Sequence, residues 1–210
     1  MPAIKKAIKA EPVAGLVLAA GASTRMGTPK QLLPAGHGLL IERVLSQALE
    51  SDLDRVILVL GYRAEEIRER IRFRKEPSRL EIVENSGYTQ GISSSILSGL
   101  SRVEKDYNHV LILLGDMPHI TSGVVNRLLA GYLASGLSLG ALKVGSRRSH
   151  PVVIGRPFFP ALHQLTGDRG ARDLFLRYSD QVCLVEPGEE YKDSDIDTYE
   201  EYLEFKKTLE

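Results

Sequence analysis

The sequence predicts an α/β fold, a three-layer α/β/α arrangement with a mostly parallel central sheet. Four short runs are apolar almost throughout: VAGLVLAAG from Val13, RVILVLG from Arg55, LEIVEN from Leu80 and HVLILLGD from His109. Strands without polar alternation are buried on both faces, which is typical of a parallel sheet. Segments of helical period lie between these runs, and such alternation with right-handed crossovers places helices on both faces of the sheet.

Three segments carry apolar side chains at helical spacing, in residues 41–49, 92–103 and 124–133. From Gly136 onward the pattern is less regular. Residues 138–144, 150–155 and 181–187 are interpreted as strands, and residues 158–165 and 171–178 as short helices. No linker separates this part of the chain, so we expect a single domain over residues 1–210, with the part from about residue 136 decorating the same sheet.

Composition excludes several classes of protein. The chain has 27 Lys and Arg residues and 27 Asp and Glu residues, so its net charge is zero. It therefore has no overall positive potential that would attract nucleic acid or an anionic membrane. The single cysteine, Cys183, excludes an internal disulfide framework and is interpreted as a buried core thiol. Residues 1–15 lack the apolar core of a signal peptide, and no segment approaches the ~18 apolar residues of a membrane span. We therefore expect a soluble, cytoplasmic protein.

Charged and glycine-rich segments follow the first and fourth apolar runs. The first loop contains Gly21, Arg25, Gly27 and Lys30, and the second turn is GDMP, residues 115–118. Ligands of open α/β sheets bind beyond the carboxyl ends of the strands. Glycines let backbone N–H groups approach a ligand, and Arg and Lys add positive charge, so the first loop predicts a phosphate cradle. Neither the P-loop nor the dinucleotide fingerprint G-x-G-x-x-G fits its spacing.

The loop GASTRMGTPK, residues 21–30, matches the pattern G-x-S-x-R-M-G-x-x-K and resembles the nucleotidyltransferases related to the molybdenum cofactor enzymes. The segment LAAGASTRMG, residues 18–27, most resembles the cytidylyltransferase branch. The resemblance implies a Rossmann-like nucleotidyltransferase fold, and it extends over nearly the whole chain in the family's order. Its further matches are ENSGYTQGISSSI (84–96), GDMP (115–118), HPV (150–152), TGDRGAR (166–172) and DIDT (195–198).

The chain departs from that branch at two positions. Tyr199 follows DIDT where the branch commonly has Pro, but Thr198 with Glu201 still predicts a capping box at the start of a final helix. Ser149 stands before His150 where glycine is expected.

The resemblance implies transfer of CMP from CTP to the terminal phosphate of molybdopterin cofactor, with release of pyrophosphate. It assigns Arg25, Lys30 and Asp116 as the catalytic residues. Arg25 and Lys30 would neutralise the β- and γ-phosphates, and Asp116 would hold a Mg²⁺ ion together with Asp197, or with Asp195 in its place. The alternative for Asp116 is a helix cap. The alternative for the later aspartates is solvation of the turn before the last helix.

The resemblance also implies a nucleotide-binding set, which includes the cationic loop and the segment before residue 96. Its members are Leu18, Ala19, Ala20, Gly21, Ser23, Arg25, Gly27, Lys30, Asn85, Gly91, Ser93 and Ser94. Guanylyl-transferring relatives commonly show LAGG in place of LAAG, and a methyl group at Ala20 would leave less room for a purine. The alternative for the two serines is that they only open the following helix.

On the acceptor side, the resemblance assigns His150, Asp168 and Arg169. A histidine beside a strand-starting proline and a salt-bridged helix start are the structural alternatives. The implied partners are CTP, molybdopterin cofactor and an apo-molybdoenzyme or its chaperone.

Three other functions stay open from the sequence. They are guanylyl or other nucleotidyl transfer to a different phosphate, an NAD(P)H-dependent oxidoreductase on the same fold, and a non-catalytic carrier of the cofactor. The aspartates argue against the oxidoreductase, because hydride transfer needs no metal carboxylates.

Overall fold

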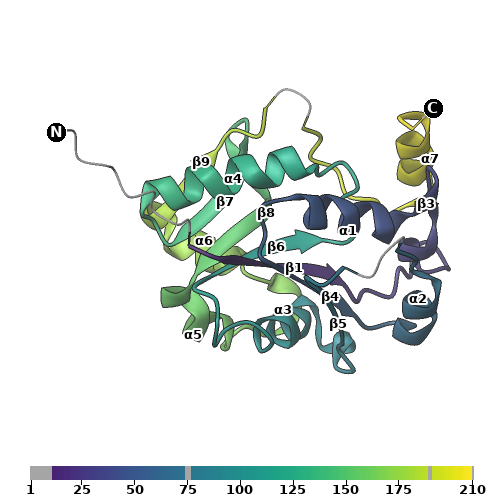
Figure 1. Cartoon of the computed structure of the whole chain (residues 1–210), viewed down its shortest axis with the longest axis horizontal. Coiled ribbons are helices and arrows are strands. Elements are labelled where there is room, and N and C mark those ends of the chain that lie inside the picture. The colour runs from purple at the N-terminus through teal and green to yellow at the C-terminus, as the bar shows by residue number, and fades with distance from the viewer. Residues whose placement is uncertain (1–10, 74–76, 189–190, 210) are drawn as a thin grey trace.

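A seven-stranded sheet forms the middle layer of the protein (Figure 1). The computed structural model describes residues 11–73, 77–188 and 191–209. The strand order is β5-β4-β1-β6-β8-β7-β9, and within the sheet only β8 runs antiparallel to its neighbours, β6 and β7. The strands are β1 (Val13–Ala19), β4 (Arg55–Leu60), β5 (Leu80–Glu84), β6 (His109–Leu114), β7 (Leu139–Val144), β8 (Arg147–Gly155) and β9 (Val182–Val185). The predicted α/β fold with a mostly parallel sheet is confirmed.

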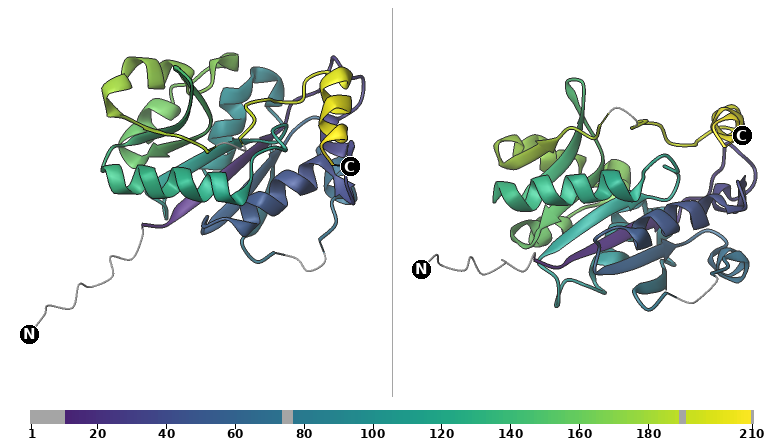
Figure 2. Two further views of the ribbon diagram at one scale, coloured as in Figure 1. Left: turned by 90° about the horizontal axis from the view of Figure 1, so that it is seen from above. Right: turned by 45° about the horizontal axis from the view of Figure 1, so that its top comes forward.

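Helices cover both faces of this sheet. On one face, α1 (Leu40–Glu50) and α4 (Ser122–Ser135) pack side by side, with α2 (Ala64–Arg70) at the same core (Figure 2). On the other face lie α3 (Ile92–Leu100), α5 (Phe159–Leu162) and α6 (Arg172–Arg177). The last helix, α7 (Tyr199–Lys207), packs through Tyr202 and Phe205 on a third, smaller core.

Short elements connect these layers. A two-stranded ladder joins β2 (Pro34–Ala35) to β3 (Gly38–Leu39) just before α1. The 3₁₀ turns are η1 (Lys30–Leu32), η2 (Tyr88–Gln90), η3 (Arg156–Phe158), η4 (Gly167–Arg169) and η5 (Ser179–Gln181).

The register of the central strands brings the two candidate loops together. β1 and β6 are parallel neighbours with Leu18 opposite Leu114, so both chains leave the sheet at the same edge. The N–H of Gly115 donates to the carbonyl of Leu18 at 2.8 Å. A Cβ atom on Gly115 would lie 2.8 Å from the Cβ of Ala19, so glycine permits this close approach. The sheet therefore fixes Asp116 beside the cationic loop.

Several local predictions can be compared with the structure. The strand expected at residue 150 begins at Arg147, and β7, β8 and β9 belong to the same sheet as the earlier strands. The capping box of Thr198 and Glu201 is present, and Tyr199 begins α7. Cys183 is only half-buried, because β9 is an edge strand, so the prediction of a buried core thiol was wrong in degree. In the part of the chain described, no helix is long and apolar enough to cross a membrane.

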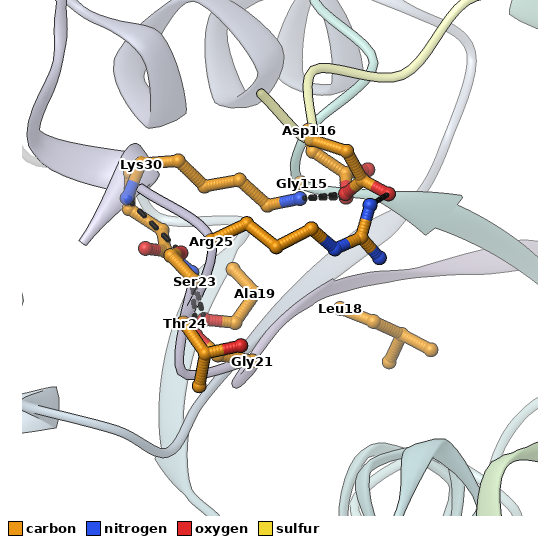
Figure 3. A pocket seen from close by; sticks show the side chains of 11 residues that line it. Leu18, Ala19, Gly21, Ser23, Thr24, Arg25, Lys30, Gly115 and Asp116 are labelled. Carbon is orange, nitrogen blue, oxygen red and sulfur yellow. Dashed lines mark hydrogen bonds and ion pairs between the residues drawn. The ribbon is translucent and has the colours of Figure 1, made fainter. Parts of the chain in front are cut away.

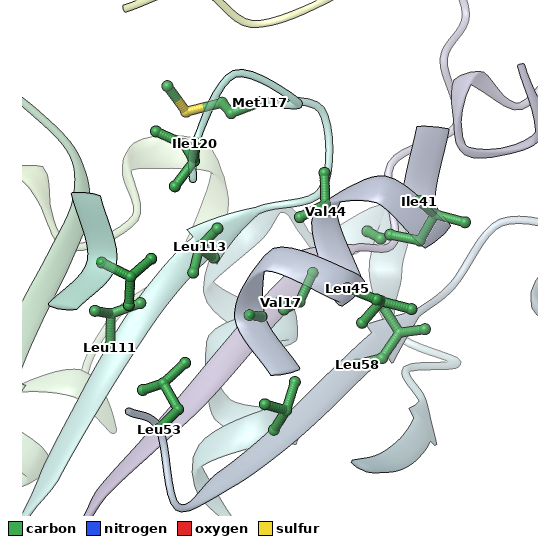
Figure 4. Close-up of a cluster of buried hydrophobic side chains, with 14 of the residues drawn as sticks. Val17, Ile41, Val44, Leu45, Leu53, Leu58, Leu111, Leu113, Met117 and Ile120 are labelled. Carbon is green, nitrogen blue, oxygen red and sulfur yellow. The ribbon is translucent and has the colours of Figure 1, made fainter. Parts of the chain in front are cut away.

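Core packing yields a stability prediction. Leu58 is fully buried between the sheet and α1 (Figure 4), and truncation to alanine should lower the free energy of unfolding by about 2–5 kcal/mol through lost burial and a residual cavity. Leu203 in α7 is 43% exposed, so Leu203→Ala should change it by less than about 0.5 kcal/mol. Urea denaturation measures both. Equal losses would mean that the sheet face around Leu58 is not the main core.

Candidate functional site

A cavity of about 230 Å³ opens at the carboxyl ends of β1 and β6 (Figure 3). Residues from the cationic loop, the GDMP turn and the segment before α7 line it. They are Leu18, Ala19, Gly21, Ser23, Thr24, Arg25, Lys30, Gln31, Gly115, Asp116 and Asp197. The structure thus brings together all three residues predicted to be catalytic and both predicted metal ligands.

The cationic loop is held in shape by its own hydrogen bonds. The Ser23 hydroxyl accepts the N–H of Lys30 at 3.1 Å, and the Ser23 carbonyl accepts the N–H of Met26 at 2.9 Å. The buried Gln31 side chain donates to the carbonyl of Ala19 at 2.9 Å. Gly27 has φ of +67°, a conformation that favours glycine. These hydrogen bonds and Gly27 therefore hold the loop in one conformation. The side chain of Arg25 is 68% exposed.

Lys30 joins three segments that are distant in the sequence. Its Nζ donates to Asp116 Oδ2 at 2.6 Å, to Asp197 Oδ1 at 2.9 Å and to the carbonyl of Ile196 at 2.9 Å. Arg25 also pairs with Asp197, with Nη1 to Oδ2 at 2.9 Å. Burial opposes the charge on Lys30, but the two carboxylates, Asp116 foremost, outweigh it and raise the pKa of Lys30. The hydrogen bond from Lys30 lowers the pKa of Asp197, so both groups are charged at neutral pH.

One carboxylate oxygen of Asp116 has no hydrogen-bond partner among the described residues. This atom, Oδ1, is buried, while Oδ2 bonds to Lys30. An unpaired carboxylate oxygen suits Mg²⁺, which proteins commonly hold through one or two carboxylates plus substrate oxygens and water. Over the described ranges, no group of three or more His, Cys, Asp or Glu side chains is placed to hold a metal. A divalent cation here would therefore depend on phosphate oxygens for the rest of its ligands.

The second carboxylate of the site, that of Asp197, belongs to the segment that precedes α7. The N–H of Ile196 donates to the carbonyl of Asp116 at 2.9 Å, which ties this segment to the GDMP turn. Asp197, rather than Asp195, contacts Lys30, while Asp195 lines a different cavity beside α7. The capping box then starts α7 directly after Asp197.

Ser149, the departure noted in the sequence, anchors the same segment from the other side. Its buried hydroxyl bonds to the hydroxyl of Tyr191 at 2.8 Å and donates to the carboxylate of Asp193. Tyr191 also donates to the carbonyl of His150 at 2.7 Å. Sequence reasoning missed this anchor, although a serine within a buried strand was a signal. Ser149 thus links the strand that carries His150 to the segment that carries Asp197.

The predicted nucleotide residues of the segment before residue 96, which are Asn85, Gly91, Ser93 and Ser94, do not line this cavity. Asn85 is buried and donates to the hydroxyls of Ser94 at 2.8 Å and Ser95 at 3.0 Å, shaping the turn that enters α3. Ser93 is also buried, and Gly91 has φ of +96°. The Asn85 and Ser94 side chains therefore bond within the turn that opens α3. Opening of this helix was the alternative stated for the serines.

Ala20 and Gly27 also lie outside the cavity lining. A Cβ on Gly61 would lie 2.8 Å from the Cβ of Ala20, so the Ala20 methyl group packs toward Gly61. The structure therefore does not place this methyl group in the cavity, where it would limit the size of a base.

The predicted acceptor residues line a second cavity, of about 810 Å³. His150 lines it from β8, and burial lowers the pKa of His150, so the imidazole is neutral at neutral pH. Asp168 accepts the N–H of Ile92 at 3.2 Å, and Arg169 pairs with Asp173 at 3.3 Å. His150, Asp168 and Arg169 therefore lie around one cavity, but the two charged residues already have partners within the protein.

A cationic loop and a carboxylate at the ends of adjacent parallel strands define a nucleotide-binding α/β protein. Residues 15–182 match the family described as MobA-like NTP transferase domain. The chain belongs to this family of nucleotidyltransferases.

Two curated relatives have different names. Nicotine blue oxidoreductase of Paenarthrobacter nicotinovorans is 35% identical over 197 residues, which cover 90% of this chain and 94% of the relative. Molybdenum cofactor cytidylyltransferase of Escherichia coli strain K12 is 28% identical over 192 residues, which cover 91% of this chain and 94% of the relative. The two names describe different reactions on similar chains.

Solved structures agree with the fold. The Rv0371c homologue from Mycobacterium sp. strain JC1 has a TM-score of 0.80 and 31% identity, covering 94% of this chain and 96% of that one. Rv0371c of Mycobacterium tuberculosis H37Rv, in complex with manganese, has a TM-score of 0.77 and 25% identity, covering 94% and 99%.

The Lys30 cluster yields a prediction of stability and of its pH dependence. Lys30→Met should lower the free energy of unfolding by about 2 kcal/mol, between the values typical of exposed and buried ion pairs, because the carboxylates lose their shared cation. A lowered Asp197 pKa adds stability that is present above about pH 4 and lost as the pH falls through the folded-state value. A raised Lys30 pKa adds stability that is present below about pH 10 and lost above the folded-state value.

Denaturant titrations between pH 3 and pH 9 measure this difference. Arg169→Met, which removes an exposed pair, is the matched control and should cost less than about 0.5 kcal/mol at every pH. A Lys30→Met effect that stays constant down to pH 3 would contradict the ion cluster.

Proposed function

We propose that this protein transfers CMP from CTP to the terminal phosphate of molybdopterin cofactor and releases pyrophosphate. The observation that carries the proposal is the juxtaposition of Arg25 and Lys30 with Asp116, whose second carboxylate oxygen has no partner among the described residues. Cations on one side and a free carboxylate oxygen on the other fit a triphosphate with a bound divalent cation.

In this reaction an oxygen of the acceptor phosphate attacks the α-phosphorus of the nucleotide. The bond to the β-phosphate breaks, and its electron pair leaves with pyrophosphate. Lys30 and the exposed Arg25 neutralise charge on the β- and γ-phosphates, while backbone N–H groups of the cationic loop orient them. Asp116 and Asp197 would hold Mg²⁺, which neutralises phosphate oxygens when bound. The attacking phosphate is already an anion at neutral pH, so no general base is required.

Support for the base and the acceptor comes from resemblance and from size. The LAAG motif and the relative named molybdenum cofactor cytidylyltransferase favour CTP and this cofactor. The cavity beside His150 has about 810 Å³, against about 230 Å³ for the cavity at Asp116, so a bulky acceptor fits. Delivery of the product to an apo-molybdoenzyme or its chaperone belongs to the same proposal.

A second candidate is an oxidoreductase, because a relative with 35% identity bears that name. An oxidoreductase function would leave the ion cluster at Asp116 without a role, since hydride transfer from NAD(P)H needs no metal-binding carboxylates. Transfer of GMP, or transfer to another phosphate, would use the same cluster with different base or acceptor contacts.

Pyrophosphate release separates these functions. The purified protein is incubated with Mg²⁺ and each of the four nucleoside triphosphates, with and without molybdopterin cofactor, and in parallel with NADH or NADPH. We expect release only when CTP and the cofactor are both present. Release with GTP would indicate the sister reaction. NAD(P)H oxidation without any pyrophosphate release would contradict the proposal.

Asp116→Asn tests the role of the carboxylate in that assay. It should lower the rate by at least about 10²-fold with little change in melting temperature, because the lost charge acts on the phosphates and the metal. Asp106→Asn is the matched control, since exposed Asp106 precedes the opposite end of β6. Equal rates for both variants would remove Asp116 from the chemistry.

A further inference from the structure

The cavity beside His150 is strongly cationic on one side. Four arginines line it: Arg147, Arg148, Arg169 and Arg172. Arg147 pairs with Asp193, and Arg169 pairs with Asp173. Among the residues that the structure describes, Arg148 and Arg172 have no carboxylate within salt-bridge distance. Two unpaired guanidinium groups therefore border a single cavity.

These two arginines are placed next to each other by β8 and α6. The Arg148 guanidinium lies over the ring of Phe175, 5.3 Å from its centroid, and Phe175 and Arg172 belong to the same short helix. Burial lowers the pKa of Arg148, and the positive charge of Arg172 lowers it further. The two like charges repel each other, and an anion bound by both would offset that repulsion.

The rest of the cavity is largely apolar. Ile92 and Ile96 of α3, Val152 of β8 and buried Phe175 contribute to its walls. Leu176 and Leu184, two of the exposed large hydrophobic side chains of the protein, also line it. An apolar wall beside two arginines without carboxylate partners fits a ligand that combines an apolar body with an anionic group.

We propose that Arg148 and Arg172 bind an anionic group of the acceptor, and that this group is separate from the phosphate that attacks the nucleotide. The inference rests on the proposed function and deepens it by naming the class of acceptor. Neither arginine lines the cavity at Asp116, and neither Lys30 nor Asp116 lines the cavity of the arginines. The acceptor therefore carries at least two anionic groups, one at each cavity, joined by a body that the apolar wall can bind.

His150 lines the larger cavity, and the charge of Asp116, which lines the smaller one, acts on the pKa of His150. Its Nδ1 atom is buried without a partner among the described residues.

A binding experiment tests the arginine pair without relying on turnover. Riboflavin 5′-phosphate is the probe, because it joins a flat heteroaromatic ring to one phosphate and its fluorescence reports binding. Arg148→Met and Arg172→Met should each weaken its binding by about tenfold, the loss of one charge-assisted contact. Riboflavin, which lacks the phosphate, should bind the wild-type protein about tenfold more weakly.

Controls separate charge from packing. Methionine keeps an apolar side chain over Phe175, and Arg148→Lys keeps the charge and should retain part of the binding. Arg147→Met, an arginine of the same cavity that pairs with Asp193, should change affinity less than twofold. Equal losses in Arg147→Met and Arg148→Met, or equal binding of riboflavin and its phosphate, would overturn the proposal.

The kinetic consequence is a selective change in KM. With CTP and molybdopterin cofactor, Arg148→Met should raise the KM of the acceptor about tenfold and leave the KM of CTP unchanged. A raised KM for CTP alone would overturn the inference. If no nucleotide supports pyrophosphate release but probe binding still depends on both arginines, the proposed function fails and the anion site stands.

Discussion

The ion cluster of Lys30 with Asp116 and Asp197 is the interaction on which the site depends. It joins a loop after β1, a turn after β6 and the segment before α7, with sequence separations of 86 and 167 residues. The sheet makes it possible, because parallel neighbours β1 and β6 end at the same edge. Ile196 and Ser149 hold the third segment in place through hydrogen bonds to the GDMP turn and to Asp193. The fold therefore specifies three charges at one point.

The contacts of the ion cluster also indicate how the site would change when a nucleotide binds. The ammonium group of Lys30 lies between two carboxylates, one of which also pairs with Arg25. It has three oxygen neighbours, a setting that a metal ion also favours. A triphosphate with a divalent cation would supply both a new partner for Lys30 and a new cation for Asp116 and Asp197. Each of these charges would then keep a partner of opposite sign, so exchange of partners need not expose an unpaired buried charge.

Much of this architecture could be predicted from local patterns. The uninterrupted apolar runs located the central strands, and the polar residues directly after them located Arg25, Lys30 and Asp116. Asp197 followed only from a resemblance, because no local pattern indicates that a segment 81 residues further on returns to Asp116. Contacts made by β8 were missed for the same reason. Its antiparallel insertion between β6 and β7 pairs Ser149 with Asp193 and places Arg148 over Phe175.

The central claim is that the cavity at Asp116 binds a nucleoside triphosphate together with a divalent cation. Isothermal titration of the wild-type protein with CTP, in the presence of Mg²⁺ and again in excess chelator, tests it most directly. The account predicts binding of one CTP per chain that weakens by at least about tenfold without the metal. Binding of CTP that is indifferent to Mg²⁺, or tight binding of NADPH that CTP does not displace, would contradict it.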